Sequence, residues 1–418
     1  GMVKTYHRKK LLVSITCVIL ALLLISIRLL YVCVFQSSYY LEKAQKLHER
    51  ERDIKALRGE ILDRNGVVLA SNKTVCTVSV IHSQITQPQE VIQMLVKELD
   101  ITEEAARKRV EKVSSIERVK TNVDKETGDR IREYNYSGVK VDEDYKRYYP
   151  YSKLCSKVLG FTGSDNQGIL GLEAKYDAYL SGTPGQILTL TDAWGVEVKN
   201  GNEERDEPEK GSNLYTSIDI NIQSYAQQLA QKTLEQKQAK SVSIIVMNPE
   251  NGEILAMTNE PEYDLNNPYE LNSDLLISST GTSKMDLLNN MWRNFCINDT
   301  YEPGSIFKMV TATAALETGS VTLNDHFTCG GSAIVADRKI RCHKTTGHGT
   351  QTFTQTVMNS CNPAFIEWGR RVGTERFFEY MGKLGLLEKT GIDIAGEAST
   401  IIHKQENVGE VELATMSF

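Results

Sequence analysis

Ser305 and Lys308 are the residues whose types and spacing could carry out nucleophilic chemistry. A serine hydroxyl is a weak nucleophile that needs a base, and a lysine whose pKa is lowered by apolar surroundings can be that base. The turn signal Pro303-Gly304 precedes them and the apolar run 310–316 follows, which predicts a buried helix with Ser305 in its first turn. Side chains three residues apart share a helix face, and the positive helix end favours an oxyanion. The pattern therefore predicts a serine acyl-transfer site.

The same Ser-x-x-Lys pattern also occurs at residues 137–140, so the pattern is not specific by itself. That copy lies in the polar and aromatic stretch 134–149, whose alternation predicts a strand. In a strand, side chains three positions apart point to opposite sides. The context therefore favours Ser305 over Ser137.

The bulk composition excludes some classes of protein. The chain has 418 residues, enough for two or three domains, and a formal net charge of −6 with charges of both signs interleaved. No basic stripe is present, so we expect no nucleic-acid partner. Its eight cysteines include no Cys-x-x-Cys pair, so we expect no metal site. Acyl transfer to a serine needs no cofactor, and we expect none.

The N-terminal region predicts a membrane anchor. Residues 1–10 are basic, and the apolar stretch 11–35 is interrupted only by Arg28, which can snorkel. A cleaved signal peptide is the alternative, but residues 31–35 are bulky and offer no small-x-small cleavage site. The basic residues before the span predict a single-pass protein of the cell membrane with a cytoplasmic tail at 1–10 and the bulk of the chain outside.

The stretch after the anchor predicts a mixed α/β domain over residues 36–205. Residues 36–57 are expected to form a charged helix, and residues 58–70 a strand, an Asn-Gly turn and a strand. Two helices are predicted within 87–113, the second capped by Thr102.

The polar, turn-rich segment 200–212 predicts a domain boundary, with a second domain at 206–418. Beyond it the pattern predicts a strand, a helix, a hairpin and then the Ser305 helix, at 214–218, 222–236, 242–248 with 253–258, and 304–316. Strands followed by a central helix and more helices indicate an α+β fold.

At family level, the chain resembles the class B penicillin-binding proteins, membrane-anchored D,D-transpeptidases of bacterial cell-wall synthesis. The motifs that carry the resemblance follow the family's order: Arg58-Gly59 with Asp63-Arg64-Asn65-Gly66, Arg147-Tyr148-Tyr149-Pro150, Gly171-Leu172-Glu173 with Asp177 and Leu180-Ser181-Gly182, Thr216-Ser217-Ile218-Asp219 with Gln223, Met247-Asn248-Pro249 with Gly252-Glu253, and Arg293-Asn294 with Tyr301 to Lys308. Ile306 stands where the family more often has Thr. The resemblance implies an N-terminal transmembrane helix, a pedestal of the penicillin-binding protein dimerisation type, and the N-terminal part of a penicillin-binding, serine β-lactamase-like transpeptidase domain.

The resemblance also implies a second active-site segment, Ser-x-Asn, which Ser360-Cys361-Asn362 supplies. It lies between two predicted helices. By the resemblance, Ser360 relays a proton to the leaving amine and Asn362 binds the peptide bond of the substrate. A literal Ser-Asp-Asn at 164–166 precedes the nucleophile in a Gly-rich loop and is interpreted as chance.

The third family segment is Lys-Thr-Gly on a strand beside the site. Residues 389–391 have these letters, but they follow a predicted helix directly, and residues 390–393 resemble the family's Thr-Gly-Ile-Asp turn, which precedes the true segment. We therefore expect the true segment to lie beyond residue 418, with the transpeptidase domain C-terminally incomplete. These 418 residues are then expected to bind penicillin poorly or not at all.

Cysteines and histidines cluster in the loop after the Ser305 helix. Cys329 and Cys342 could form a disulfide outside the membrane or remain two free thiols. His343 and His348 invite a metal or base interpretation, but without further ligand spacing surface histidines are favoured.

The leading function is cross-linking of D-Ala-D-Ala stem peptides of nascent peptidoglycan through an acyl-serine, with β-lactams as inhibitors. The alternatives are a hydrolase, such as a carboxypeptidase or β-lactamase, and a catalytically silent scaffold or penicillin-sensing module. The pedestal argues against a hydrolase because it positions a domain rather than adding chemistry. The resemblance further implies a polytopic glycan polymerase and division or elongation proteins as partners.

Overall fold

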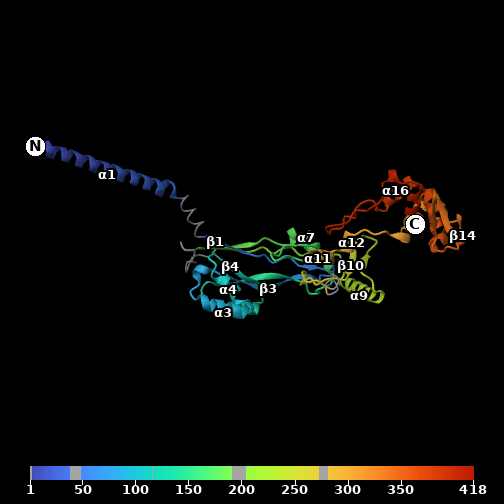
Figure 1. The fold of residues 1–418 in the computed structure, drawn as a ribbon, viewed down its shortest axis with the longest axis horizontal. Helices are drawn as coiled ribbons and strands as arrows, with labels where there is room; N and C mark the ends of the chain where they lie inside the picture. Colours follow the sequence, from blue (N-terminus) through green and yellow to red (C-terminus); the bar gives the residue numbers. More distant parts are fainter. Residues whose placement is uncertain (1, 38–48, 115, 191–203, 273–280) are drawn as a thin grey trace. The chain divides into compact units, whose positions relative to one another are not determined.

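The computed structural model describes all residues except 1, 38–48, 115, 191–203 and 273–280 (Figure 1). The first elements are α1 (Met2–Phe35), β1 (Glu49–Ile54), β2 (Ile61–Leu62), β3 (Val68–Val80), η1 (His82–Gln84), α3 (Pro88–Leu99), α4 (Glu103–Val110), β4 (Glu117–Val123), α5 (Lys125–Glu133), β5 (Val139–Tyr148), α6 (Ser156–Leu159), α7 (Gly171–Lys175), α8 (Asp177–Leu180), β6 (Gly185–Leu190), β7 (Glu204–Asp206) and β8 (Leu214–Tyr215).

The remaining elements are α9 (Ile220–Lys237), β9 (Val242–Met247), β10 (Ile254–Glu260), α11 (Lys284–Trp292), α12 (Phe295–Asn298), η2 (Gly304–Phe307), α13 (Lys308–Glu317), β11 (His326–Cys329), β12 (Ser332–Val335), β13 (Arg338–Arg341), β14 (Gly349–Thr352), α14 (Phe353–Met358), α15 (Asn362–Val372), α16 (Thr374–Lys383), η3 (Gln405–Asn407) and α17 (Glu410–Met416).

Helix α1 contains the predicted anchor. Its segment Val13–Val34 is long and apolar enough to cross a membrane, and none of its most apolar part is buried inside the protein. At a rise of about 1.5 Å per residue, its 22 residues extend over about 33 Å, close to the thickness of a bilayer's hydrocarbon core. The prediction of an N-terminal apolar helix long enough to span a membrane is confirmed.

The chain packs as two compact units. The first comprises Gly1–Leu62, Val68–Pro150 and Ala178–Leu214, and the second comprises Asp63–Val67, Tyr151–Asp177 and Tyr215–Phe418. The limits predicted from the sequence, 36–205 and 206–418, stay a prediction, and each unit is described separately below.

The first unit is built around the long antiparallel strand β3, which pairs with β2, β4 and β5. Helices α3, α4 and α5 share one apolar core with this sheet, contributed chiefly by Val78 and Val80 of β3 and by Ile92 and Leu95 of α3. The predicted pair of helices is confirmed, and the Thr102 side chain caps α4 by accepting the Ala105 N–H at 3.2 Å.

Helix α5 crosses the sheet very closely at Gly128. A β-carbon there would lie 2.5 Å from the Cys76 sulfur of β3, which is too close for any larger residue. A helix glycine costs up to about 1 kcal/mol relative to alanine, so close packing with β3 explains its presence.

The prediction of a charged helix over residues 36–57 is wrong for residues 49–54. Residues 49–54 form β1, which pairs antiparallel with β6 from Glu49 opposite Leu190 to Ile54 opposite Gly185. Residues 38–48 lie outside the described part of the chain. Strand pairing with a partner far along the sequence overrides the local helical preference.

The opening motif has structural roles. Arg58 is fully buried, and the Gly59 carbonyl accepts a hydrogen bond from the buried Arg147 at 2.8 Å. A β-carbon on Gly59 would lie 1.8 Å from the Ser212 carbonyl oxygen, so only glycine fits. The Arg58-Gly59 motif and the motif that begins at Arg147 therefore contact each other within the first unit, although they are far apart in the sequence.

In the second unit, α9 packs on the predicted hairpin of β9 and β10, which is confirmed. Gln223 of α9 is fully buried and forms paired hydrogen bonds with the Met257 backbone of β10, donating at 3.0 Å and accepting at 2.8 Å. The helix begins at Ile220, where Asp219 accepts N–H groups of its first turn.

The later part of the second unit, orange to red in Figure 1, packs α13 to α17 with β11 around one core, and β14 pairs with β11. Trp368 of α15 is fully buried at its centre and donates its indole N–H to Thr356 at 3.1 Å. Helix α15 passes close to α17 at Gly369, where a β-carbon would lie 1.9 Å from the Ser417 hydroxyl. This core fixes α13 and α15, which begin at the predicted site residues Lys308 and Asn362.

Candidate active site

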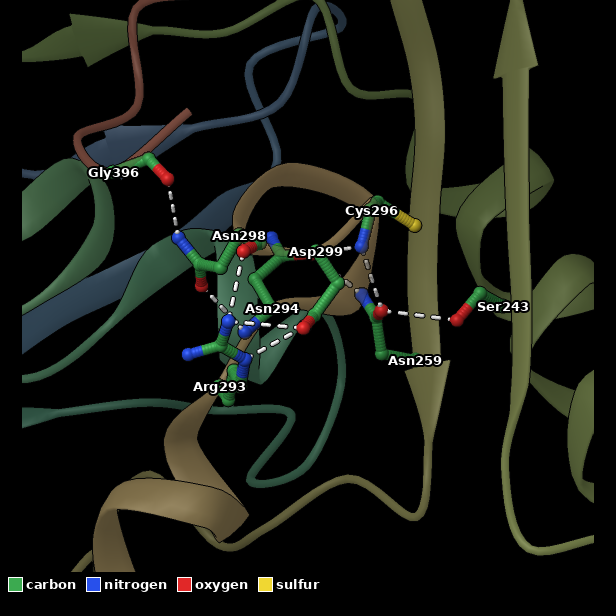
Figure 2. A network of polar contacts seen from close by, with 8 residues as sticks. All are labelled: Ser243, Asn259, Arg293, Asn294, Cys296, Asn298, Asp299 and Gly396. Atoms are coloured by element: carbon green, nitrogen blue, oxygen red, sulfur yellow. Dashed lines mark hydrogen bonds and ion pairs between the residues drawn. The ribbon is translucent and has the colours of Figure 1, made fainter. Parts of the chain in front are cut away.

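The segment leading to Ser305 is held by a network of polar side chains (Figure 2). Arg293 makes a bidentate ion pair with Asp299, at 2.7 and 2.9 Å. The Asn294 side chain accepts the Cys296 N–H at 3.1 Å and a hydrogen bond from Asn259 of β10 at 2.9 Å. These contacts hold the α12 turn against the hairpin of β9 and β10. The position of the chain that leads to Ser305 is therefore fixed.

The same network reaches a later segment of the chain. The Asn298 amide donates to the Gly396 carbonyl at 2.9 Å, as Figure 2 shows. The Arg293-Asn294 motif therefore ties the approach to Ser305 both to β10 and to the turn around residue 396.

Ser305 lies in the short 3-10 helix Gly304–Phe307, and α13 begins at Lys308. The prediction that Ser305 lies in the first turn of the α-helix is therefore wrong in detail. The Gly304 φ of +60° allows the chain to turn tightly just before the serine. The tighter winding still points both side chains to the same side, since Lys308 Nζ lies 3.2 Å from Ser305 Oγ.

Lys308 is the centre of the site. Its side chain is buried, with 4% exposed, and Nζ lies 2.9 Å from the Ser360 carbonyl, 3.0 Å from Ser360 Oγ and 2.6 Å from Asn362 Oδ1. Nζ also lies 5.5 Å from the centre of the Phe365 ring. The sequence-predicted residues Ser305, Lys308, Ser360 and Asn362 are thus brought together around one amine.

The environment of Lys308 favours its neutral form. Burial lowers its pKa below the ordinary 10.5, although Cys342 and Cys361 act in the opposite direction. A neutral amine has a lone pair, so it can accept the proton of the Ser305 hydroxyl. The arrangement can therefore activate a serine nucleophile.

Ser360 lies in the turn between α14 and α15, as predicted, and Asn362 is the first residue of α15. Ser360 has a φ of +44°, a conformation that is uncommon for a residue with a side chain and that concentrates at functional sites. The Asn362 amide is held at both ends, because Nδ2 also donates to the Arg341 carbonyl at 3.3 Å. The turn and the first residue of α15 therefore present two hydrogen-bonding side chains beside the lysine.

The literal Lys-Thr-Gly at 389–391 lies in irregular structure rather than on a strand. Thr390 donates through both its N–H and its hydroxyl to Glu397, each at 2.7 Å. The polar groups of Thr390 therefore stabilise a local turn. In the second Ser-x-x-Lys copy, Ser137 and Gly138 lie in a turn and strand β5 starts at Val139, so the strand expected from the sequence contains only Lys140 of the pair.

The paired cysteines of the sequence analysis, Cys329 and Cys342, are buried free thiols in the structure. A disulfide between them stays a prediction. Sequence analysis did not anticipate that Cys361 and His348 lie with them, all four ligand atoms being within 4.8 Å of one another. The available signal was three cysteines and a histidine within residues 329–361, but their spacing matches no common metal motif.

Comparisons with known proteins agree with this architecture. A model of the penicillin-binding protein dimerisation domain matches residues 53–216, and one of the penicillin-binding protein transpeptidase domain matches residues 242–418. The chain belongs to the class B penicillin-binding proteins.

Among curated class B relatives, stage V sporulation protein D of Bacillus subtilis is 38% identical over 98% of this chain and 62% of the relative. Peptidoglycan D,D-transpeptidase MrdA of Acinetobacter baumannii is 27% identical over 96% of this chain and 62% of the relative. The chain thus spans 62% of the length of both proteins.

Among solved structures, penicillin-binding protein PBP2 of Helicobacter pylori, in its complex with MreC, matches with a TM-score of 0.71 and 25% identity. The match covers 88% of this chain and 73% of that chain. The penicillin-binding protein 2X of Streptococcus thermophilus shares the fold, with a TM-score of 0.67 and 23% identity over 88% of this chain and 56% of that chain.

Proposed function

We propose that this chain carries the acyl-transfer residues of a peptidoglycan D,D-transpeptidase. Ser305 attacks the carbonyl carbon of the penultimate D-Ala of a stem peptide, and the terminal D-Ala leaves. The amine of a neighbouring stem then takes the acyl group, which cross-links the wall. The observation that carries this proposal is the contact of Lys308 Nζ with Ser305 Oγ at 3.2 Å and with Ser360 Oγ at 3.0 Å.

The geometry supports a role for each side chain. Neutral Lys308 accepts the proton as the Ser305 oxygen bonds to the carbonyl carbon. The Ser360 hydroxyl, in contact with the same amine, then passes a proton to the leaving nitrogen. The Asn362 amide, fixed by Lys308 and the Arg341 carbonyl, lies where it can bind the peptide bond.

The proposal includes β-lactams as acylating inhibitors, because they present a strained amide to the same nucleophile. It also includes a cell-membrane location, with the N-terminus cytoplasmic. Partners among wall-synthesis proteins, including a polytopic glycan polymerase, are proposed by analogy with the relative PBP2, whose solved complex contains MreC.

A scaffold or penicillin-sensing role is the second candidate. It is favoured by the structural observation that 389–391 forms a local turn, so the chain presents no Lys-Thr-Gly strand among its described residues. A scaffold would keep the fold without acylating Ser305.

The test is mass spectrometry of the full chain after long incubation with excess benzylpenicillin. We expect one covalent adduct on the peptide that contains Ser305. The adduct should disappear in Ser305→Ala, because that change removes the nucleophile.

The matched control is Ser137→Ala, which removes the serine of the other Ser-x-x-Lys copy and should leave the adduct unchanged. An adduct that persists in Ser305→Ala would contradict the assignment of the nucleophile. No adduct at any time would reject catalysis by this chain and favour the scaffold.

A further inference from the structure

The hairpin of β12 and β13, with the residues that follow it, carries a cluster of positive charge. Residues 330–344 contain one acidic residue, Asp337, and four cationic residues: Arg338, Lys339, Arg341 and Lys344. All four cationic side chains are exposed. The excess is local, because the whole chain has a formal net charge of −6 with charges of both signs interleaved.

These four cations have no anionic partner within the protein. In the part of the chain that the structure describes, none of their side chains forms an ion pair or a hydrogen bond. The nearby helix α15 differs, because Arg370 and Arg371 each pair with Glu367, at 2.7 and 2.9 Å. Like charges that lie close together repel one another, so an anion from outside the protein would relieve this repulsion.

Strand pairing places two of the cations on one face of the hairpin. Ile334 lies opposite Lys339, and Ser332 lies opposite Arg341. Residues directly opposite each other, and residues two apart in one strand, share a face. Ile334 is 78% exposed, whereas Ile340 on the other face is half-buried. Ile334, Lys339 and Arg341 therefore form a solvent-exposed face, which we call the basic face.

The basic face lies beside the proposed catalytic residues. Asn362 Nδ2 donates to the Arg341 carbonyl at 3.3 Å, and Asn362 Oδ1 lies 2.6 Å from Lys308 Nζ. Lys308 Nζ lies in turn 3.2 Å from Ser305 Oγ. An extended peptide advances about 3.3 to 3.6 Å per residue, so a peptide with its scissile bond at Ser305 needs roughly three residues to reach Arg341.

The side chains of the basic face match the chemistry of an acidic peptide. Arginine and lysine form charge-assisted hydrogen bonds with carboxylates, and arginine can do so through two parallel bonds. The exposed Ile334 offers apolar contact to the aliphatic part of a peptide. A peptide with free carboxylates on aliphatic side chains uses all three residues.

We propose that the basic face binds carboxylates of the substrate's stem peptide, upstream of the bond that Ser305 attacks. The inference rests on the proposed function, which supplies a peptide at Ser305. Lys339 and Arg341 are then specificity-determining residues. They favour acidic stems with free carboxylates over stems whose carboxylates are amidated.

A membrane surface fits the basic face less well. Anionic lipid surfaces are recognised by clusters of about four to eight cations. Strand alternation leaves only Lys339 and Arg341 on this face, because Arg338 lies on the other face with Val335. Two cations beside one apolar side chain have the dimensions of a single peptide.

The test compares the binding of two fluorescent peptides to the full chain in detergent. Both peptides end in D-Ala-D-Ala, and roughly three residues upstream one carries glutamate where the other carries glutamine. Binding is measured in the Ser305→Ala chain, so that acylation does not contribute. We expect tighter binding of the glutamate peptide, with a preference that shrinks as salt is raised to about 0.5 M, because salt screens exposed charges.

One double variant and one matched control test the residues. Lys339→Gln combined with Arg341→Gln should reduce the preference for glutamate by about 2- to 30-fold, as expected for the loss of two exposed ion pairs. Arg338→Gln removes one positive charge from the other face of the same hairpin and should leave the preference intact. Both chains should unfold at the temperature of the parent, since the changed side chains are exposed and unpaired.

The outcomes separate this proposal from the proposed function. Equal binding of the two peptides, or a preference that survives in the double variant, would overturn the carboxylate site. Binding of anionic lipid vesicles that the double variant loses, without any peptide preference, would assign the face to a membrane instead. A peptide preference that depends on Lys339 and Arg341, in a chain whose Ser305 takes no benzylpenicillin adduct, would support this site and reject catalysis.

Discussion

Lys308 Nζ has more oxygen neighbours than an ammonium group has hydrogens. Four oxygens of Ser305, Ser360 and Asn362 lie within 3.2 Å of it, whereas an ammonium donates only three hydrogen bonds. A neutral amine also makes three hydrogen bonds, two as donor and one as acceptor, so the number of neighbours does not separate the two forms. Burial lowers the pKa of Lys308 and so favours the neutral form, and the 3.2 Å separation places its lone pair within reach of the Ser305 hydroxyl.

Replacing Lys308 by arginine tests this at the residue scale. A guanidinium stays protonated, so we expect Lys308→Arg to slow the acylation of Ser305 by about 10²- to 10⁴-fold. The measurement is the rate of adduct formation relative to the unmodified chain. Lys140→Arg, in the other Ser-x-x-Lys copy, is the matched control and should leave the rate unchanged.

The same rate should depend on pH. Only neutral Lys308 accepts a proton, so the rate should rise with pH and level off above a pKa that lies below the ordinary 10.5. Because a base with a lowered pKa is neutral over a wider range, activity extends to lower pH than an ordinary lysine would allow. A rate that falls as pH rises, or that is still rising at pH 10.5, would contradict the assignment.

At the scale of elements, the turn between β2 and β3 shows how a family motif stabilises the fold. Asp63 is fully buried and accepts the N–H groups of Asn65 and Val67 at 2.8 Å each, and that of Ile220 at 3.1 Å. Burial acts to raise the pKa of Asp63, but these donors outweigh it and hold the pKa below the ordinary 3.8. The carboxylate thus joins the turn to the start of α9.

Asp63→Asn should destabilise the protein by about 1 to 3 kcal/mol at neutral pH, because an ionised acceptor of several N–H groups is lost. The pKa is lower in the folded state, so the stabilisation is complete above pH 3.8 and is lost as pH falls through the folded pKa. Urea unfolding of both chains should therefore show a difference that shrinks in acid. The exposed Asp165→Asn is the control, and a difference that is the same in acid as at pH 7 would contradict this role.

At the scale of the whole molecule, the chain combines a long apolar helix with two folded units, one of them bearing the proposed catalytic residues. The apolar segment Val13–Val34 has the length of a membrane span. Because positive residues precede it, we propose that the two units lie on the outer side of the cell membrane.

This topology predicts a specific digestion pattern. The chain should resist extraction from membranes by alkaline carbonate, and protease added to intact protoplasts should remove the folded units and leave only a short fragment that contains the span. A cytoplasmic marker protein serves as the control for lysis. Full protection of the folded units in unbroken cells, with digestion after lysis, would reverse the orientation.

The features that the sequence determined by itself are local ones. The helices α3 and α4, the hairpin of β9 and β10, and the Ser305–Lys308 pair depend on spacings of a few residues, so periodicity, caps and turns suffice to predict them. The Ser360 turn was predicted because residues 360–362 match the Ser-x-Asn segment of the family that the chain resembles.

The features that only the tertiary structure decided depend on distant partners. Residues 49–54 form a strand because β6 supplies hydrogen bonds from more than a hundred residues away. Cys361 and His348 meet Cys329 and Cys342 because strand pairing and a helix cap bring four element ends together. No local pattern encodes such a meeting, since the free energy that fixes it comes from packing and pairing across the fold.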